Sequence, residues 1–424
     1  MTKSAQIVVT AFQANVTGTA SNPTTLKLPN GNVLVSYVTE LGGLPGTEDG
    51  FHIRGQMYNP NGEVVGREIA FSFPDPIVSR DFDIIVRPDG TIAIAALGAA
   101  LRDRKSPVMV RSFSIDDEGN RETVSNIPSL KGFFEDNTSP TIANIGGDGL
   151  IILSVSQKPL NDSIFYRILG VDGAPDINDS FGRISGADTV LASATLGNGN
   201  VVTVVDLDGN GDTFDEVFFN ILTSNGIFSG SGEALGGRGS ILDPQVVALA
   251  SGGFVIAGTK TAGDPDVVFQ VFDVQGVPVT GTVEFGIDEI PLRGNNNEPT
   301  IAALEDGGFI VFYDKDRGSP QIRGQRFDSE GRPVGNDFLV ANENGGQLSA
   351  ASLDDGRIAI SYAVTSGSIK TAIVTVNENV VRGTGDSEVL NGTEARDFIQ
   401  SEGGNDTIAA GNGEDRVVAG TGRR

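Results

Sequence analysis

Short segments in which aliphatic and polar residues alternate recur along this chain, and turns that contain glycine separate them. The sequences HIRGQMYNPNGEVVG (52–66) and QIRGQRFDSEGRPVG (321–335) are near copies, and VVFQVFDVQGVPVTG (267–281) is a third. Alternation with a period of two is typical of strands, and the glycine between two such runs is typical of a hairpin turn. Weaker copies have their turns at Gly119, Gly173, Gly226 and, in IKTAIVTVNENVV, at Asn377 to Asn379.

A second hairpin precedes each copy, so each repeat is predicted to contain four strands. Its turns contain Gly31, Gly90, Gly149, Gly199, Gly253, Gly308 and Gly356. The intervals between these glycines run from 48 to 59 residues, which is about the size of one blade of a β-propeller. We therefore predict an all-β fold, a seven-bladed β-propeller over residues 1–381. A β-sandwich array or a solenoid is the alternative.

The two ends of the repeat region favour a closed ring. The seventh repeat lacks a clear last strand, and AQIVVTAFQAN near the N-terminus offers a spare one. Pairing that strand with the last blade would remove an exposed sheet edge. Several repeats also open with proline, in NPTTLKL, SPTIANI, DPQVVAL and EPTIAAL, and proline is tolerated at the first residue of a strand.

The charge of the chain excludes several kinds of partner. Asp and Glu number 55 against 30 for Lys and Arg, which gives a formal net charge of −25. Nucleic acid and anionic membranes bind basic surfaces, so we expect this chain to bind neither. No apolar run is long enough to span a membrane, and the absence of cysteine excludes disulfides and thiolate metal sites.

Acidic residues recur every nine positions near the C-terminus, and an aliphatic residue follows each of them two positions later. The acids are Asp397, Asp406 and Asp415, and the aliphatic residues are Ile399, Ile408 and Val417. The same register reaches back to Glu388 and Leu390. Glycine pairs between the acids allow tight turns, the aliphatic residues would fill a thin core, and carboxylate and carbonyl oxygens are the ligands that calcium prefers.

This segment, residues 382–424, resembles the RTX, or hemolysin-type, calcium-binding repeats of secreted bacterial proteins. The resemblance implies a short parallel β-roll with Ca²⁺ shared between turns two repeats apart. Asp397 would then pair with Asp415, and Glu388 with Asp406. A disordered tail rich in glycine and acid is the alternative, and such a tail would become ordered when calcium binds.

The resemblance also implies secretion by a bacterium, through a type I-like route that reads a C-terminal signal. The N-terminal MTKSAQIVVTAF lacks the apolar segment of a cleavable signal peptide. RTX proteins usually carry their signal after the repeats, whereas this chain stops at GTGRR. We expect either a fragment of a longer protein or a vestigial tail.

A second candidate calcium site lies in the sequence DLDGNGDTFDE of the fourth repeat. Its oxygen-bearing residues alternate as in an EF-hand loop, where alternate side chains reach one cation and a glycine allows the bend. The predicted ligands are Asp206, Asp208, Asn210, Asp212 and Asp215. The spacing resembles the calcium hairpins of integrin-type propeller blades. A solvated acidic turn that serves only the backbone is the alternative.

Three tyrosines and one histidine are candidate ligand-binding residues. Tyr37, Tyr313 and Tyr362 are equivalent in the repeats and fall in blades that would adjoin in a closed ring. Their phenols could stack on a sugar or donate to it, although packing at strand ends explains them as well. His52 follows an acidic loop, and its imidazole titrates near neutral pH; it is a candidate base or a plain rim residue.

Two kinds of function follow from these observations. A secreted calcium-binding propeller that serves as a binding, adhesion or scaffold module is the first expectation, since no catalytic motif is evident. An extracellular hydrolase or lyase that uses an acidic ligand face is the alternative, with a polysaccharide or a cell-surface ligand as partner. Paired carboxylates for glycoside chemistry are possible among so many acids, but the sequence singles out no pair.

Overall fold

The computed structural model describes most of the chain. The described residues are 8–13, 19–40, 51–73, 76–99, 107–130, 137–147, 149–156, 163–169, 187–207, 216–236, 240–261, 266–285, 296–315, 320–375, 379–392, 397–401, 403–411 and 416–418. Within them the regular structure is almost entirely β-strand, with one short 3₁₀ turn at Asp354–Gly356. No helix in these residues has the length and hydropathy needed to cross a membrane.

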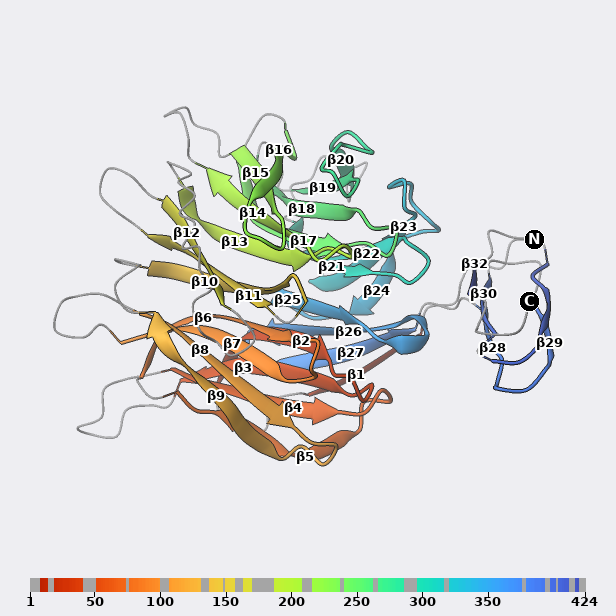
Figure 1. Ribbon diagram of the computed structural model, residues 1–424, viewed down its shortest axis with the longest axis horizontal. Coiled ribbons are helices and arrows are strands. Elements are labelled where there is room, and N and C mark those ends of the chain that lie inside the picture. The colour runs from red at the N-terminus through yellow and green to blue at the C-terminus, as the bar shows by residue number, and fades with distance from the viewer. Residues whose placement is uncertain are drawn as a thin grey trace.

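Antiparallel sheets make up the body of the molecule (Figure 1). Within each sheet, strands that are consecutive in the chain pair in meander order, and one sheet also includes the N-terminal strand. We number the repeating units along the chain. Unit 1 contains β2 (Ala20–Lys27), β3 (Val33–Glu40), β4 (Phe51–Tyr58) and β5 (Val64–Phe71). Unit 2 contains β6 (Ile77–Val86), β7 (Ile92–Gly98), β8 (Val108–Ile115) and β9 (Arg121–Leu130). A single bridge, Phe51 to Ile77, joins these two units into one sheet.

The remaining units of the body repeat this order. Unit 3 contains β10 (Asn137–Ile145), β11 (Gly149–Ser156) and β12 (Ser163–Leu169). Unit 4 contains β13 (Ala187–Thr195), β14 (Val201–Leu207), β15 (Glu216–Leu222) and β16 (Phe228–Ala234). Unit 5 contains β17 (Ile241–Ala248), β18 (Phe254–Lys260), β19 (Asp266–Phe272) and β20 (Val283–Phe285). Unit 6 contains β21 (Asn296–Ala303), β22 (Phe309–Lys315), β23 (Gln321–Phe327) and β24 (Phe338–Ala341).

Unit 7 joins the two ends of the body. It contains β25 (Gly345–Ser352), β26 (Arg357–Val364) and β27 (Ile369–Thr375), and its fourth strand is β1 (Val8–Gln13) from the start of the chain. β1 pairs with β27 in antiparallel register, from Val8 opposite Thr375 to Gln13 opposite Lys370. The N-terminal strand therefore covers the edge that β27 would otherwise expose.

The turns inside the units use the residues that the sequence singled out. At the turn between β23 and β24, Gly331 has a φ of 73°, a conformation that glycine adopts without strain. Asp328 supports the same turn, because its Oδ1 accepts the backbone N–H groups of Glu330 (3.0 Å) and Arg332 (2.9 Å). An Asp or Asn side chain that bonds its own turn in this way fixes the hairpin locally.

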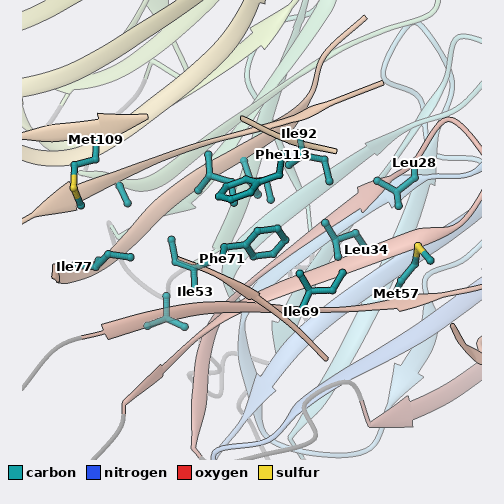
Figure 2. Close-up of a cluster of buried hydrophobic side chains, with 14 residues drawn as sticks. Leu28, Leu34, Ile53, Met57, Ile69, Phe71, Ile77, Ile92, Met109 and Phe113 are labelled. Carbon is teal, nitrogen blue, oxygen red and sulfur yellow. The ribbon is translucent and has the colours of Figure 1, made fainter. Parts of the chain in front are cut away.

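The first strands of the units contact one another in sequence. β2 contacts β6, β6 contacts β10, and the series continues through β13, β17 and β21 to β25, which contacts β2. The hydrophobic cores lie between facing units. Figure 2 shows the cluster between units 1 and 2, where Phe71 and Phe113 meet edge to face at 5.2 Å. Burying such apolar faces against each other is the main stabilising term of this arrangement.

A separate set of short strands follows the body and pairs in parallel. β28 (Asn379–Arg382), β30 (Asp397–Gln400) and β32 (Arg416–Val418) form one sheet, and β29 (Val389–Asn391) pairs with β31 (Thr407–Ala409). Figure 1 shows this group to one side of the body. Strands two nonapeptides apart are neighbours, because Val389 lies opposite Thr407 and Ile399 opposite Val417. Ile399 is fully buried and forms part of a thin core.

Candidate active site

A cavity of about 500 Å³ lies among the first strands of the units, and we call it the central cavity. Residues of β2, β6, β10, β13, β17, β21 and β25 line it. Four of the lining residues are acids, namely Asp81, Asp83, Asp243 and Glu298. The described part of the lining contains no lysine, arginine or histidine. A concave site with a few convergent polar groups is the usual form of a ligand pocket.

The backbone that lines the cavity departs from regular strand geometry. Each first strand shows a shift of register against its neighbour, for example between Leu242 and Gln245 in β17. Four residues at these shifts have positive φ, at 49° for Asn22, 50° for Asp243, 49° for Glu298 and 53° for Gln347. Residues other than glycine rarely adopt this conformation, and it concentrates at functional sites.

Three of these four strained residues stand directly before a proline, in Asn22–Pro23, Asp243–Pro244 and Glu298–Pro299. The sequence had suggested that the prolines merely open a strand. Instead each lies within its strand at the irregularity. Proline lacks an N–H group, so no ladder hydrogen bond is lost there, and the residue before it faces the central cavity.

Hydrogen bonds connect the strained residues from one unit to the next. The backbone N–H of Asn22 donates to Oε1 of Gln347 at 2.9 Å, and the backbone N–H of Gln347 donates to Oε2 of Glu298. The backbone N–H of Glu298 donates to Oγ1 of Thr259 on β18 at 3.2 Å. These bonds link units 5, 6, 7 and 1 and hold the side chains of Gln347 and Glu298 in place.

Asp243 differs from its equivalents because no donor to its carboxylate is found among the described residues. Glu298 accepts the backbone N–H of Gln347 in the next unit. By analogy, Asp243 would accept the backbone N–H of Glu298, but Oγ1 of Thr259 accepts that group instead. The Asp243 side chain is open to the cavity while protein surrounds the cavity. Partial removal from bulk water therefore raises the pKa of this carboxyl. A carboxyl group with a raised pKa holds its proton at higher pH than an ordinary one.

Asp83 is held more firmly. Its Oδ2 accepts the hydroxyl of Thr141 at 2.6 Å and the backbone N–H of Ile142 at 2.9 Å, both from β10. Its Oδ1 accepts the N–H of Ile84 at 2.8 Å. Burial raises the pKa of Asp83, and the three hydrogen bonds oppose that rise. Because Oδ2 is engaged by unit 3 and Oδ1 by its own strand, Asp83 serves mainly to join two units and to add negative charge to the cavity.

The three tyrosines singled out from the sequence do not face the central cavity. Tyr37 and Tyr362 are fully buried, and Tyr313 is nearly so. Each hydroxyl donates to a carboxylate, namely Glu68 (2.6 Å), Asp337 (3.2 Å) and Glu343 (2.8 Å). A basic residue opposite each tyrosine on the next strand binds the same carboxylate, namely Arg54, Arg323 and Lys370. The repeat alignment of the tyrosines is thus correct, but their rings are not available to stack on a sugar.

The other predicted site residues fall outside the central cavity. His52 is the second residue of β4 and has an exposed side chain, and it is not among the lining residues. Asp206 lies in β14 opposite Val217. Asp208, Asn210, Asp212 and Asp215 lie outside the described residues, as does Asp415. Among the residues that are described, no group of three Asp, Glu or His side chains is placed to hold a metal ion.

Oxygen atoms converge on the glycines of the parallel strands. A Cβ added at Gly392 would lie 2.0 Å from the carbonyl oxygen of Ala410 and 2.6 Å from Oδ2 of Asp397, whose side chain is 1% exposed. At Gly383 it would lie 2.7 Å from the carbonyl oxygen of Ser401. Carboxylate and carbonyl oxygens around a space that only glycine leaves open form a donor set that fits Ca²⁺.

The predicted pairing of Glu388 with Asp406 also has a counterpart in the structure. The backbone N–H of Glu388 donates to Oδ1 of Asp406 at 3.1 Å. The Glu388 carboxylate itself accepts the backbone N–H of Thr384 at 2.7 Å. The two acids are therefore neighbours across the roll, although the Glu388 side chain is engaged by its own turn.

Comparison with known proteins identifies the C-terminal segment. Residues 382–422 match the family model described as RTX calcium-binding nonapeptide repeat (4 copies). This segment therefore consists of RTX repeats, as the sequence predicted. A search of curated proteins gives no match to the chain.

The body resembles solved structures at low sequence identity. An ulvan lyase from a new polysaccharide lyase family, bound to a GlcA(1-4)Rha3S unit, is 12% identical with a TM-score of 0.54, covering 85% of this chain and 95% of that one. A protein of unknown function from Dyadobacter fermentans is 16% identical with a TM-score of 0.52, covering 87% and 99%. An α-L-arabinanase from Penicillium chrysogenum, complexed with arabinobiose, is 12% identical with a TM-score of 0.49, covering 87% and 98%.

The similarities to the ulvan lyase and to the Dyadobacter fermentans protein place the body among all-β folds of the propeller type. They also correct one expectation drawn from the sequence, that of a binding, adhesion or scaffold module. The similarity to a polysaccharide lyase over 85% of the chain contradicts that expectation and favours the alternative, an extracellular hydrolase or lyase.

Proposed function

We propose that this chain is an extracellular glycoside hydrolase that acts through the carboxylates of the central cavity. One observation supports the proposal above the others. The cavity brings four acids together, and two of them, Asp243 and Glu298, stand in strained backbone at equivalent positions. Cleavage of a glycosidic bond commonly uses one protonated and one ionised carboxyl group on either side of that bond.

We assign the general acid to Asp243 and the general base to Asp81. Asp243 is suited to donate a proton because its pKa is raised. Asp81 lies on β6 and Asp243 on β17. In the series of contacts between first strands, β10 and β13 lie between β6 and β17 in one direction, and β2, β25 and β21 lie between them in the other. The two carboxyl groups thus approach the cavity from opposite sides. The hydroxyl of Ser79 donates to Oδ2 of Asp81 at 3.1 Å and helps to orient it.

The proposed reaction balances with water as the only co-substrate. Asp243 gives its proton to the glycosidic oxygen as the bond from that oxygen to the anomeric carbon breaks. Asp81 takes a proton from a water molecule, and the water oxygen bonds to the anomeric carbon. Proton exchange with solvent then restores both carboxyl groups.

The lining of the cavity favours hydrolysis over elimination. A lyase that acts on a uronate must neutralise the sugar carboxylate while a base removes the adjacent proton. The described lining supplies no cation for that task, and its ionised carboxylates would repel the substrate. The ulvan lyase similarity therefore supports a carbohydrate-active fold, and the proposed reaction differs from that of the lyase.

We also propose that the seven units are the blades of a closed ring over residues 1–381. The order of contacts supports this architecture, since the first strands contact one another in series and β25 contacts β2. The pairing of β1 with β27 would then fasten the last blade. Residues 382–424 form the predicted second region, the calcium-binding tail. Its parallel pairing already begins at Asn379, because β28 pairs with β30, so the tail reaches three residues further back than the predicted boundary.

Calcium is the cofactor we propose for that tail. Asp397, Asp406 and Asp415, with backbone carbonyl groups of the glycine turns, would hold it, and Ca²⁺ bound there would neutralise crowded oxygens and order the roll. We retain the loop from Asp206 to Asp215 as a second proposed site. RTX repeats are consistent with secretion, and we propose an extracellular location.

A panel of neutral, amino and acidic polysaccharides tests the proposed activity. New reducing ends without ultraviolet absorbance from unsaturated uronate would indicate hydrolysis. The D243N variant should lose at least roughly a hundredfold in kcat, the usual contribution of general acid catalysis. Native activity should fall as pH rises through the raised pKa of Asp243, because the protonated form is then lost.

Stability measurements separate loss of function from loss of fold in this test. The ionised form of Asp243 is disfavoured in the folded protein, so folding stability decreases as pH rises through its raised pKa. D243N removes that effect and should melt no lower than the native protein at neutral pH. Full activity in a folded D243N variant, or turnover by elimination, would refute the assignment.

A further inference from the structure

Two arginines meet where unit 2 contacts unit 1, outside the central cavity. Arg111 lies on β8 and Arg121 begins β9, and neither is among the residues that line the cavity. Their guanidinium carbons lie 5.6 Å and 5.2 Å from the centre of the Phe113 ring. That ring is fully buried and packs edge to face on Phe71 of unit 1 (Figure 2). We call this pair of arginines the arginine seam.

The protein supplies few acceptors to the arginine seam. A guanidinium carries five N–H donors, yet each of the two has one acceptor among the described residues, and both acceptors belong to Ser72. Arg111 donates to the Ser72 carbonyl oxygen, and Arg121 donates to its Oγ at 3.3 Å. Nε of Arg111 is buried and has no acceptor in that part of the chain. Most of the donors of the pair are therefore left for solvent or for a ligand.

The charge of the arginine seam is also uncompensated. Neither arginine forms an ion pair with a described Asp or Glu residue, although the chain has 55 acids against 30 basic residues. Burial lowers the pKa of the Arg111 guanidinium, and the charge of Arg121 lowers it further. The Phe113 ring attracts cations over its face but carries no net charge. Two like charges held together in this way are costly unless a counter-ion joins them.

We infer that the arginine seam binds a tetrahedral oxyanion, namely a sulfate or phosphate group that is either carried by a glycan or free in solution. Both arginine side chains remain partly exposed, so a ligand can approach them. A guanidinium binds two oxygens of such a group side by side. A phosphate or sulfate ester has three terminal oxygens, so one group can accept from both arginines, whereas a carboxylate has only two. This site is separate from the proposed hydrolysis and does not depend on it.

The variants R111Q and R121Q test the inference. Each removes one positive charge and keeps a long side chain beside the Phe113 ring. The matched control is R67Q, because Arg67 is an exposed arginine on β5 of the neighbouring unit. The melting temperature of each variant without ligand shows that it is folded. Since the two arginines lie on different strands, one variant still decides the question if the other does not fold.

Calorimetric titration of the full chain at fixed ionic strength measures binding. The probes are sodium sulfate, sodium phosphate, a dextran sulfate oligomer, and uncharged dextran and oligogalacturonate of equal length. The net charge of −25 repels polyanions, so tight binding of dextran sulfate requires a local basic site. We expect that binding to weaken as salt is added. R111Q and R121Q should each weaken it by roughly tenfold, as expected for loss of hydrogen bonds between charged groups, and R67Q should leave it unchanged.

The outcomes distinguish the two sources of the oxyanion. Binding of dextran sulfate that depends on Arg111 and Arg121 supports a group carried by a glycan. Binding of sulfate or phosphate alone, with the same dependence, supports a free ion. The inference is overturned if none of these three probes binds, if R67Q weakens binding as much as R111Q and R121Q do, or if oligogalacturonate or uncharged dextran binds equally well. The D243N assay tests the hydrolase proposal separately, at the central cavity.

Discussion

The glycine at position 392 allows a direct test of how the tail binds calcium. We consider the G392A variant of the full chain. An added Cβ would lie 2.0 Å from the carbonyl oxygen of Ala410, and it would lie 2.6 Å from Oδ2 of Asp397. Both distances are far shorter than a van der Waals contact, and one of the atoms belongs to the backbone. The roll must therefore shift, and the oxygens proposed to hold Ca²⁺ must shift with it.

Overpacking of this kind costs about 1–3 kcal/mol. If that cost falls on the calcium-bound form alone, calcium affinity should fall by roughly 5- to 150-fold. Calorimetry with CaCl₂ measures this change directly. Protection of Arg416 from trypsin as a function of calcium concentration gives an independent measure, because Arg416 lies in β32 of the roll.

The same chain provides a matched control at Gly385. A Cβ added there meets no atom within 4 Å, so G385A should titrate like the native protein. Both substitutions introduce the same side chain into the same segment and differ only in what that side chain meets. If G392A and G385A give the same calcium midpoint as the native chain, the assignment of calcium to this cradle is wrong.

Two further predictions concern the body. Asp306 and Arg326 form a buried ion pair at 2.5 Å with side chains 1% and 6% exposed, so D306N should lower the free energy of unfolding by about 3–5 kcal/mol in urea titrations; a loss below about 1 kcal/mol would contradict this. Removal of residues 1–13 deletes β1 and leaves β27 as an open edge, so the truncated chain should associate in size-exclusion chromatography. A stable monomer with an unchanged melting temperature would contradict that expectation.

Much of the fold could be predicted from local sequence patterns. Hairpins between adjacent strands depend on residues that are close in sequence, so turn residues such as Asp328 and Gly331 predict them. The nine-residue period of the tail was equally readable, because each repeat has an aliphatic residue two positions after its acid. Ile399 and Leu390 are buried as this pattern predicts, whereas Val417 is 44% exposed. Even the spare N-terminal strand was identifiable, since it followed from counting strands in the repeats.

The candidate active site was not predicted, for a physical reason. A strand that alternates regularly presents every second residue to each face, but an irregularity with positive φ breaks that rule. The side chains of Asp243 and Glu298 reach the cavity through such irregularities. One signal was available, namely the polar residue before each recurrent proline. A proline at the first residue of a strand explains the same pattern, so this signal does not by itself indicate a site.

The tyrosines show a second limit of prediction from sequence. Their equivalence in the repeats was visible in the sequence, whereas the carboxylates that their hydroxyls bind were not. Their acids come from unequal places, since Glu68 lies on β5, Asp337 precedes β24, and Glu343 precedes the first strand of its unit. Without a fixed spacing, no sequence pattern could tell that the phenols were already satisfied inside the protein.

The pairing of β1 with β27 has a consequence for how the chain folds during synthesis. Val8 pairs with Thr375, so β1 leaves the ribosome long before its partner strand β27 has been synthesised. Until β27 has been synthesised, the backbone groups of β1 have no strand to pair with. Contacts so distant in sequence also form slowly. Completion of the body is thus deferred until β27 has been synthesised, and a chain that is cut short before residue 375 would keep its first strand unpaired.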